Sequence, residues 1–128
     1  MRFKISTLLV TFALASQRQE KNPFLSLKFD KVIMYDYQPL DEDLSLVDDK
    51  GQLATTVKSK GRALLDRATI DKLNIKIGDK KSYGRMTAMC FDPHLGIVYC
   101  LNGKVIRQVL VCMDCNALRA DIEIPAQK

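Results

Sequence analysis

The sequence predicts an α+β domain, with an antiparallel sheet that includes a C-terminal hairpin and is covered by one main helix. The pair Asn102-Gly103 separates two β-rich runs, and both of its residues tolerate the positive φ that a type I′ hairpin turn needs. Upstream, Ile70, Leu73 and Ile77 recur at i, i+3 and i+7, which is the spacing of one apolar helix face. These two patterns together indicate a hairpin sheet with a helix docked on it.

Length and composition agree with an ordinary globular chain. The 128 residues suit one domain, and 47% hydrophobic with 27% charged residues is typical of folded soluble proteins. No apolar run approaches the ~18 residues of a membrane-spanning helix. The chain has only one His, which excludes most His-rich metal sites and mechanisms that need two imidazoles.

Residues 1–15 have the pattern of a secretory signal peptide. Arg2 and Lys4 precede an apolar stretch of 11 residues, and Ala13 and Ala15 have the small-residue spacing of a cleavage site. The sequence therefore predicts a secreted or periplasmic protein. Four cysteines in such a compartment meet oxidising conditions, in which disulfides persist.

The remaining chain is expected to consist of a linker over 16–23 and a single α+β domain over 24–128. Removal of residues 1–15 leaves 18 basic residues against 15 acidic ones. This bias is too weak to argue for nucleic acid, whose binders concentrate basic charge on one face. We expect no nucleic-acid partner and no membrane span after signal removal, and the partner is unknown.

The first predicted strand is apolar on both faces. Val32 and Met34 fall on one face, and Ile33, Tyr35 and Tyr37 fall on the other. Such a strand is expected to be central or covered.

Three further segments have strand or loop character. Six acids and no Lys or Arg between Asp36 and Asp49 indicate a solvated acidic loop, with calcium as the less favoured alternative. Possible strands follow over 53–57 and 86–91, and alternation over 120–124 predicts a half-buried strand.

The main helix is expected over about residues 62–78. Thr69 is the candidate N-cap, Asp71 lies in the first turn, and Gly78 is the candidate stop. Nine basic residues against three acids between Lys58 and Arg85 fit a solvated helix face better than an anion- or polymer-binding surface.

One group of residues stands out as a candidate site. Pairing across the hairpin brings Cys90, His94, Cys112 and Cys115 to its open end, whether the loop has two residues or three with a bulge at Gly103. The spacing C-x3-H…C-x2-C supplies three thiolates and one imidazole, which a tetrahedral structural zinc accepts. In the two-residue register Cys112 points away from the other three, so zinc requires a turn between Cys112 and Cys115.

Two other chemistries compete with zinc for these residues. A disulfide can join Cys90 to Cys115, or Cys112 to Cys115. The CxxC can also be a redox pair with His94 as proton partner, although such motifs normally begin a helix. All three interpretations remain open at this point, while Cys100 is expected to be a small apolar core residue or a free thiol.

The quoted residues also carry a resemblance. The stretches CF-x-PH-x-GIVY, V-x-C-x-x-CN and IEIPA resemble small uncharacterised secreted bacterial proteins with a CF-x-PH-x-GIVYY…ISIC-x-x-CN signature. The likeness covers about residues 60–126 and departs at Cys100, where an aromatic residue is expected. It implies that the Cys/His cluster belongs together as a unit, and it implies no activity.

The sequence lacks the common motifs of nucleotide-binding proteins and hydrolases. There is no P-loop, no GxGxxG and no GxSxG, so an enzyme is unsupported. We expect an exported small protein whose Cys/His cluster is a structural clip, closed by a disulfide or by zinc. The alternatives are a thiol redox protein that uses the CxxC pair and an interaction module with a basic helix face.

Overall fold

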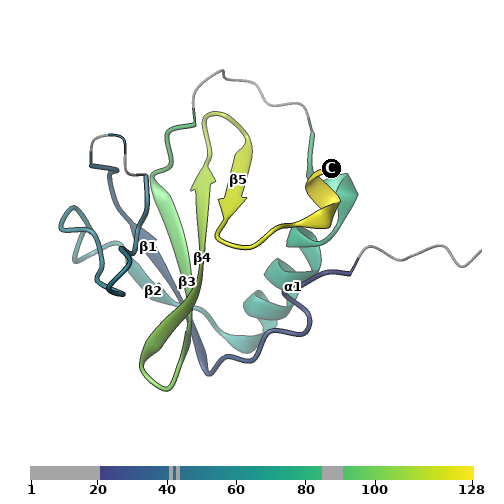
Figure 1. Cartoon of the computed structure of the whole chain (residues 1–128), viewed down its shortest axis with the longest axis horizontal. Helices are drawn as coiled ribbons and strands as arrows, with labels where there is room; N and C mark the ends of the chain where they lie inside the picture. Colours follow the sequence, from purple (N-terminus) through teal and green to yellow (C-terminus); the bar gives the residue numbers. More distant parts are fainter. Residues whose placement is uncertain (1–20, 41, 43, 85–90) are drawn as a thin grey trace, which may run out of the picture.

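The computed structural model describes residues 21–40, 42, 44–84 and 91–128. Its strands are β1 (Lys31–Asp36), β2 (Arg62–Leu64), β3 (Leu95–Leu101), β4 (Lys104–Cys112) and β5 (Ala117–Ala120). They form one antiparallel sheet in the order β2-β1-β3-β4-β5. Helix α1 (Arg67–Ile77) packs on one face, and the 3-10 turns η1 (Lys80–Ser82) and η2 (Pro125–Gln127) complete the fold (Figure 1). The predicted α+β class with a C-terminal hairpin is confirmed.

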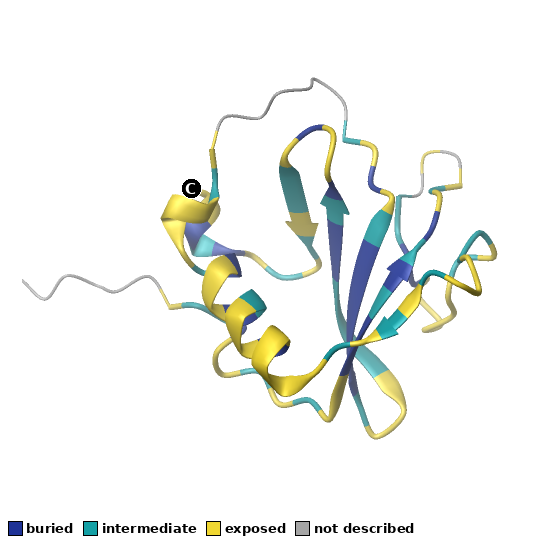
Figure 2. Ribbon diagram, turned by 180° about the vertical axis from the view of Figure 1, so that it is seen from behind, coloured by how far each residue is buried: buried dark blue, intermediate teal, exposed yellow. Residues whose placement is uncertain are grey.

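Strand β1 is internal and covered on both faces, as its sequence predicts. It pairs with β2 on one side and with β3 on the other. Val32 packs into the core beneath α1, whereas Ile33, Tyr35 and Tyr37 pack into a second core on the opposite face. The burial colours show the same arrangement, with dark strands in the centre and an exposed outer side of α1 (Figure 2).

The second face of the sheet is covered by an irregular segment within residues 44–57. Leu46 and Val47 are buried there, and Leu46 packs so closely that a Cβ at Gly96 would lie 2.3 Å from its Cδ2. The Gln108 side chain fixes this segment, because its Oε1 accepts hydrogen bonds from both Leu46 N and Val47 N at 3.1 Å. The strand predicted over 53–57 is wrong, since only an isolated bridge joins Leu53 to Val47.

Helix α1 begins later than the predicted range of 62–78. The first residues of that range form β2, and the N-cap is Asp66, whose carboxylate accepts a hydrogen bond from Thr69 N at 2.7 Å. Thr69 therefore lies inside the helix rather than at its cap. The stop at Gly78 is confirmed, and a Cβ there would lie 1.9 Å from Asn22 Nδ2, so glycine allows the N-terminal segment to dock at the helix end.

The hairpin of β3 and β4 turns at Asn102 and Gly103, as predicted. Their φ angles are 52° and 77°, both in the left-handed region that a type I′ turn requires. Leu101 pairs with Lys104 directly beside the turn.

Further from the turn, neither predicted register holds. The pairing shifts by one residue between Tyr99 and Cys100. Leu95 therefore pairs with Val111, whereas a regular two-residue loop would pair it with Leu110. A β-bulge of this kind adds one unpaired residue to one strand, and alternation of apolar residues alone does not reveal it.

The C-terminal strand also lies elsewhere than predicted. Strand β5 ends at Ala120, where the predicted strand over 120–124 would begin, and Ile124 is instead buried beneath α1 just before η2. Of the strand predicted over 86–91, only Phe91 is described, and it belongs to no strand. The predicted signal peptide lies outside the described residues, as does most of the linker. In the part of the chain that is described, no helix has the length and apolar character to cross a membrane.

Candidate functional site at the β4–β5 turn

The CxxC motif closes the turn between the last two strands. Cys112 is the final residue of β4, residues 113–116 form the turn, and β5 follows at once. A disulfide joins Cys112 to Cys115, with their Cα atoms 5.4 Å apart, well inside the usual range for such bonds. The turn is completed by Asn116, whose φ is 49°. The motif therefore lies between two strands and not at the start of a helix.

Both cysteines are removed from solvent. Cys112 is 2% exposed and Cys115 is 0% exposed. The backbone N–H of Cys115 also donates a hydrogen bond to Cys112 Sγ at 3.2 Å, within the turn itself. Thiol–disulfide exchange requires an attacking thiolate to reach one sulfur, and burial of both residues opposes this step.

His94 does not join the two bonded cysteines. It precedes β3, its side chain is half exposed, and its Nε2 lies 3.2 Å from Asp92 Oδ2. Its backbone oxygen accepts a hydrogen bond from Tyr37 N at 3.1 Å, which anchors this segment to the end of β1. The fourth predicted ligand, Cys90, lies outside the described residues.

The structure thus brings together two of the four predicted site residues, Cys112 and Cys115, as a disulfide. Across residues 21–40, 42, 44–84 and 91–128, no three His, Cys, Asp or Glu side chains are placed to hold a metal ion. The zinc interpretation of Cys90, His94, Cys112 and Cys115 stays a prediction from the sequence. The turn that this interpretation needed is present, but in this structure its two sulfurs are bonded to each other.

Cys100 has the core role that the sequence predicts. It lies on β3, is 6% exposed, packs in the second core away from α1, and keeps a free thiol. Burial raises the pKa of this thiol, so its thiolate form is disfavoured at neutral pH. A buried thiol of this kind is inert until the protein opens.

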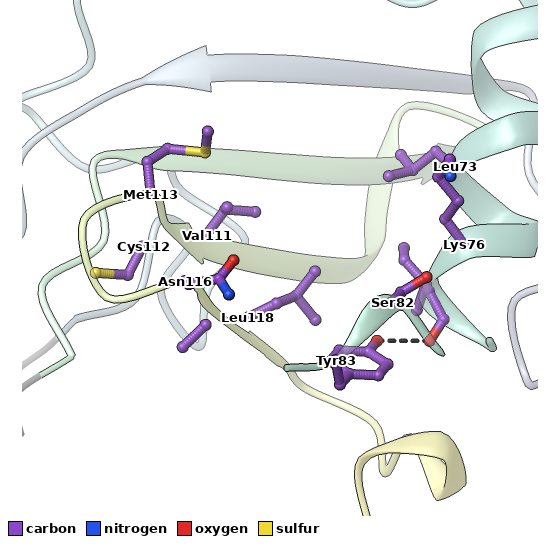
Figure 3. Close-up of a pocket in the computed structure, with 11 residues that line it drawn as sticks. Leu73, Lys76, Ser82, Tyr83, Val111, Cys112, Met113, Asn116 and Leu118 are labelled. Atoms are coloured by element: carbon purple, nitrogen blue, oxygen red, sulfur yellow. Dashed lines mark hydrogen bonds between the residues drawn. The ribbon is translucent and has the colours of Figure 1, made fainter. Parts of the chain in front are cut away.

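The turn forms one wall of a pocket that the sequence analysis missed. The pocket has a volume of about 200 Å³ and lies between α1, η1 and the β4–β5 hairpin (Figure 3). Leu73 lines it from the helix, while Val111 and Leu118 line it from the two strands. Cys112 and Met113 complete the wall at the turn. No local motif indicates this pocket, because its residues come from segments that are far apart in the chain.

A tyrosine that follows η1 shapes the far side of the pocket. The hydroxyl of Tyr83 donates a hydrogen bond to Ile77 O at 2.5 Å, which ties the segment after η1 back to the helix end (Figure 3). Burial raises the pKa of Tyr83, so the hydroxyl stays protonated and able to donate. The pocket therefore keeps a neutral, largely apolar interior.

The basic residues on α1 lie where a solvated helix face would place them. Lys72 and Lys76 are both exposed, whereas Ile70 and Ile77 are buried in the core; Lys76 also borders the pocket. The use of this face by an anionic partner stays a prediction.

No protein-family model, curated protein or solved structure matches this chain. The resemblance to small secreted bacterial proteins therefore stays a prediction.

Proposed function

We propose that this chain is an exported, non-catalytic small protein in which the Cys112–Cys115 disulfide is a structural clip for the β4–β5 turn. The observation that carries the proposal is the position of the bond, between two paired strands and with both cysteines buried. Export would supply the oxidising compartment in which such a bond forms and persists.

The clip acts at one edge of the sheet. Strand β5 is a short edge strand of four residues and pairs only with β4. Its pairing begins at Cys112 and Ala117, directly across the turn that the disulfide closes. A covalent link at this point removes conformational freedom from the turn in the unfolded chain and so favours the paired hairpin.

Zinc is the less favoured way to close the clip. A disulfide leaves neither sulfur as the thiolate that zinc binds, so a metal site would require reduction first. His94 is engaged with Asp92 on the exposed side of the chain before β3. The Cys112–Cys115 bond and the His94–Asp92 contact therefore support a clip closed by a disulfide and not by zinc.

A thiol redox protein is the second candidate, and one observation favours it. Cys112 contributes to the wall of the pocket, so one of the two residues borders open space. A partner thiolate would have to attack the sulfur from this side, form a mixed disulfide and release Cys115 as a thiolate. Only 2% of Cys112 is exposed, which makes this attack unfavourable in the folded chain.

The discriminating experiment compares wild type with Cys112→Ser in an assay of insulin reduction by dithiothreitol. The clip predicts that both proteins leave the uncatalysed rate unchanged, because no accessible thiol turns over. Acceleration by wild type that is lost in Cys112→Ser would instead establish redox catalysis. Metal content is measured on the same sample, purified without reductant or chelator. About one zinc per chain, with cysteines that react only after chelation, would contradict the disulfide clip.

A further inference from the structure

The pocket beside the disulfide has the composition of a ligand site for an apolar group. Its walls are the side chains of Leu73 on α1, Val111 on β4 and Leu118 on β5, which approach one another from separate elements (Figure 3). Each of these side chains is only partly buried, so the pocket leaves apolar surface in contact with water. Covering that surface is favourable, at about 25 cal/mol per Å².

The rim of the pocket carries an unpaired positive charge. Lys76 lines the pocket, is exposed, and forms no ion pair with any described residue. The acids nearest to Lys76 in the chain have other partners: Asp71 pairs with Arg67, and the Asp79 carboxylate accepts a hydrogen bond from the backbone N–H of Lys81. The charge at the mouth is therefore available to an anion.

The last two carbonyl groups of the helix already accept hydrogen bonds. The oxygen of Ile77 accepts the Tyr83 hydroxyl hydrogen bond, and the oxygen of Lys76 accepts from the N–H groups of Gly78 and Asp79. A free carbonyl at a helix C-terminus would repel an anion through its partial negative charge, and these bonds reduce that effect.

The size of the pocket limits the ligand. A volume of about 200 Å³ is below the ~300–1,000 Å³ typical of sites for drug-sized molecules, so the ligand must be smaller than such molecules. The lining is mostly apolar, with the Ser82 hydroxyl and the Asn116 amide as neutral polar groups and Lys76 as its one cation. This combination matches a molecule with an apolar tail and a single negative head group.

We propose that this pocket binds a free, medium-chain aliphatic carboxylate. The aliphatic chain packs among Leu73, Val111 and Leu118, and the carboxylate pairs with the Lys76 ammonium at the mouth. Because this site uses none of the disulfide chemistry, the proposal stands independently of the clip.

The test titrates three probes of equal chain length into the full purified chain: octanoate, octan-1-ol and octylammonium. Two-dimensional NMR records which backbone amides shift. We expect saturable binding of octanoate with shifts confined to the pocket residues, weaker binding of octan-1-ol and no saturable binding of octylammonium. Lys76→Gln should weaken octanoate binding by up to about fivefold, the most expected for loss of an exposed ion pair. Lys72→Gln, on the same helix but outside the pocket, should leave it unchanged.

A variant that fills the pocket completes the test. Leu73→Phe should abolish octanoate binding while the melting temperature is retained, and Ala117→Leu fills the same space from β5 if the first variant fails to fold. The proposal is overturned if octanoate does not saturate, if the three probes bind equally, or if Lys76→Gln and Lys72→Gln behave alike. Shifts outside the pocket, or an octanoate-dependent dimer, would also overturn it.

Discussion

Reduction of the Cys112–Cys115 disulfide is expected to lower the free energy of unfolding by about 2 kcal/mol. The two residues are three positions apart, so the bond closes a very short loop. The chain-entropy relation gives about 2 kcal/mol for such a loop, well below the value for a long one. For a domain of this size the melting temperature should fall by about 8 °C.

Urea unfolding followed by circular dichroism measures this change directly. Wild type is compared with and without a phosphine reductant, so that both sulfur atoms stay in place and only the bond is lost. The matched control is the double variant Cys112→Ala/Cys115→Ala, whose stability should not respond to the reductant. That variant should lie below reduced wild type, because it also loses two buried sulfur atoms.

Two results would refute this reasoning. Wild type that is equally stable with and without the bond would show that the turn is already fixed by its strands. A response of the double variant to reductant would show that another disulfide, not this one, carries the effect.

Three further perturbations test other parts of the structure, each by urea unfolding. Gln108→Leu should cost about 2–4 kcal/mol, because it leaves buried backbone groups of Leu46 and Val47 without partners; a cost below 0.5 kcal/mol would contradict that role. His94→Ala should change stability by less than about 0.5 kcal/mol, because the His94 side chain and its contact with Asp92 are exposed; a large loss would favour a metal or buried role. The backbone N–H that Asp66 caps holds the pKa of this carboxyl below its ordinary value. Its contribution to stability is therefore complete above about pH 4 and is lost as the pH falls through the folded-state pKa. Asp66→Asn should match wild type at pH 7 and lose less stability on acidification, and equal acid sensitivity would contradict the cap.

The sequence predicted the features that depend on local pattern. The two-faced alternation from Val32 to Tyr37 requires a covered strand, and β1 is one. Asn102 and Gly103 both adopt positive φ. This preference belongs to the two residues themselves, so the turn can be predicted without knowing their tertiary contacts. Gly78 likewise ends α1 where it was expected.

The errors arise where tertiary contacts decide between local alternatives. Leu64 and Leu65 suit a helix as well as a strand, and pairing with β1 places Leu64 in β2. With β2 ending at Leu64, the helix begins with Asp66 as its N-cap instead of Thr69, because the Asp66 carboxylate accepts a hydrogen bond from Thr69 N. The bulge at Tyr99 shifts the whole base of the hairpin by one residue.

The part of the candidate site that depends on local spacing was predicted correctly, and the part that depends on tertiary contacts was not. The x2 spacing of Cys112 and Cys115 brings their sulfurs together in any tight turn, and the disulfide follows from this local geometry. His94 lies just before β3, and its side chain contacts Asp92 while the two cysteines bond to each other, a choice of partners that residue spacing alone does not decide. The pocket is lined by residues from α1, β4 and β5, which are far apart in the chain. No sequence pattern indicates that these residues lie close together in the fold.

The most direct test of the account is a tryptic map of alkylated, unreduced protein. Cleavage after Arg85, Lys104, Arg107 and Arg119 places Cys90 and Cys100 in the peptide 86–104, and Cys112 and Cys115 in the peptide 108–119. We expect peptide 108–119 to be unalkylated, free of any link to another peptide, and lighter than its reduced form by two hydrogen atoms. Cys100 should be alkylated only after denaturation, because its thiol is buried. Two alkylated cysteines in peptide 108–119, or a cross-link between the two peptides, would contradict the clip.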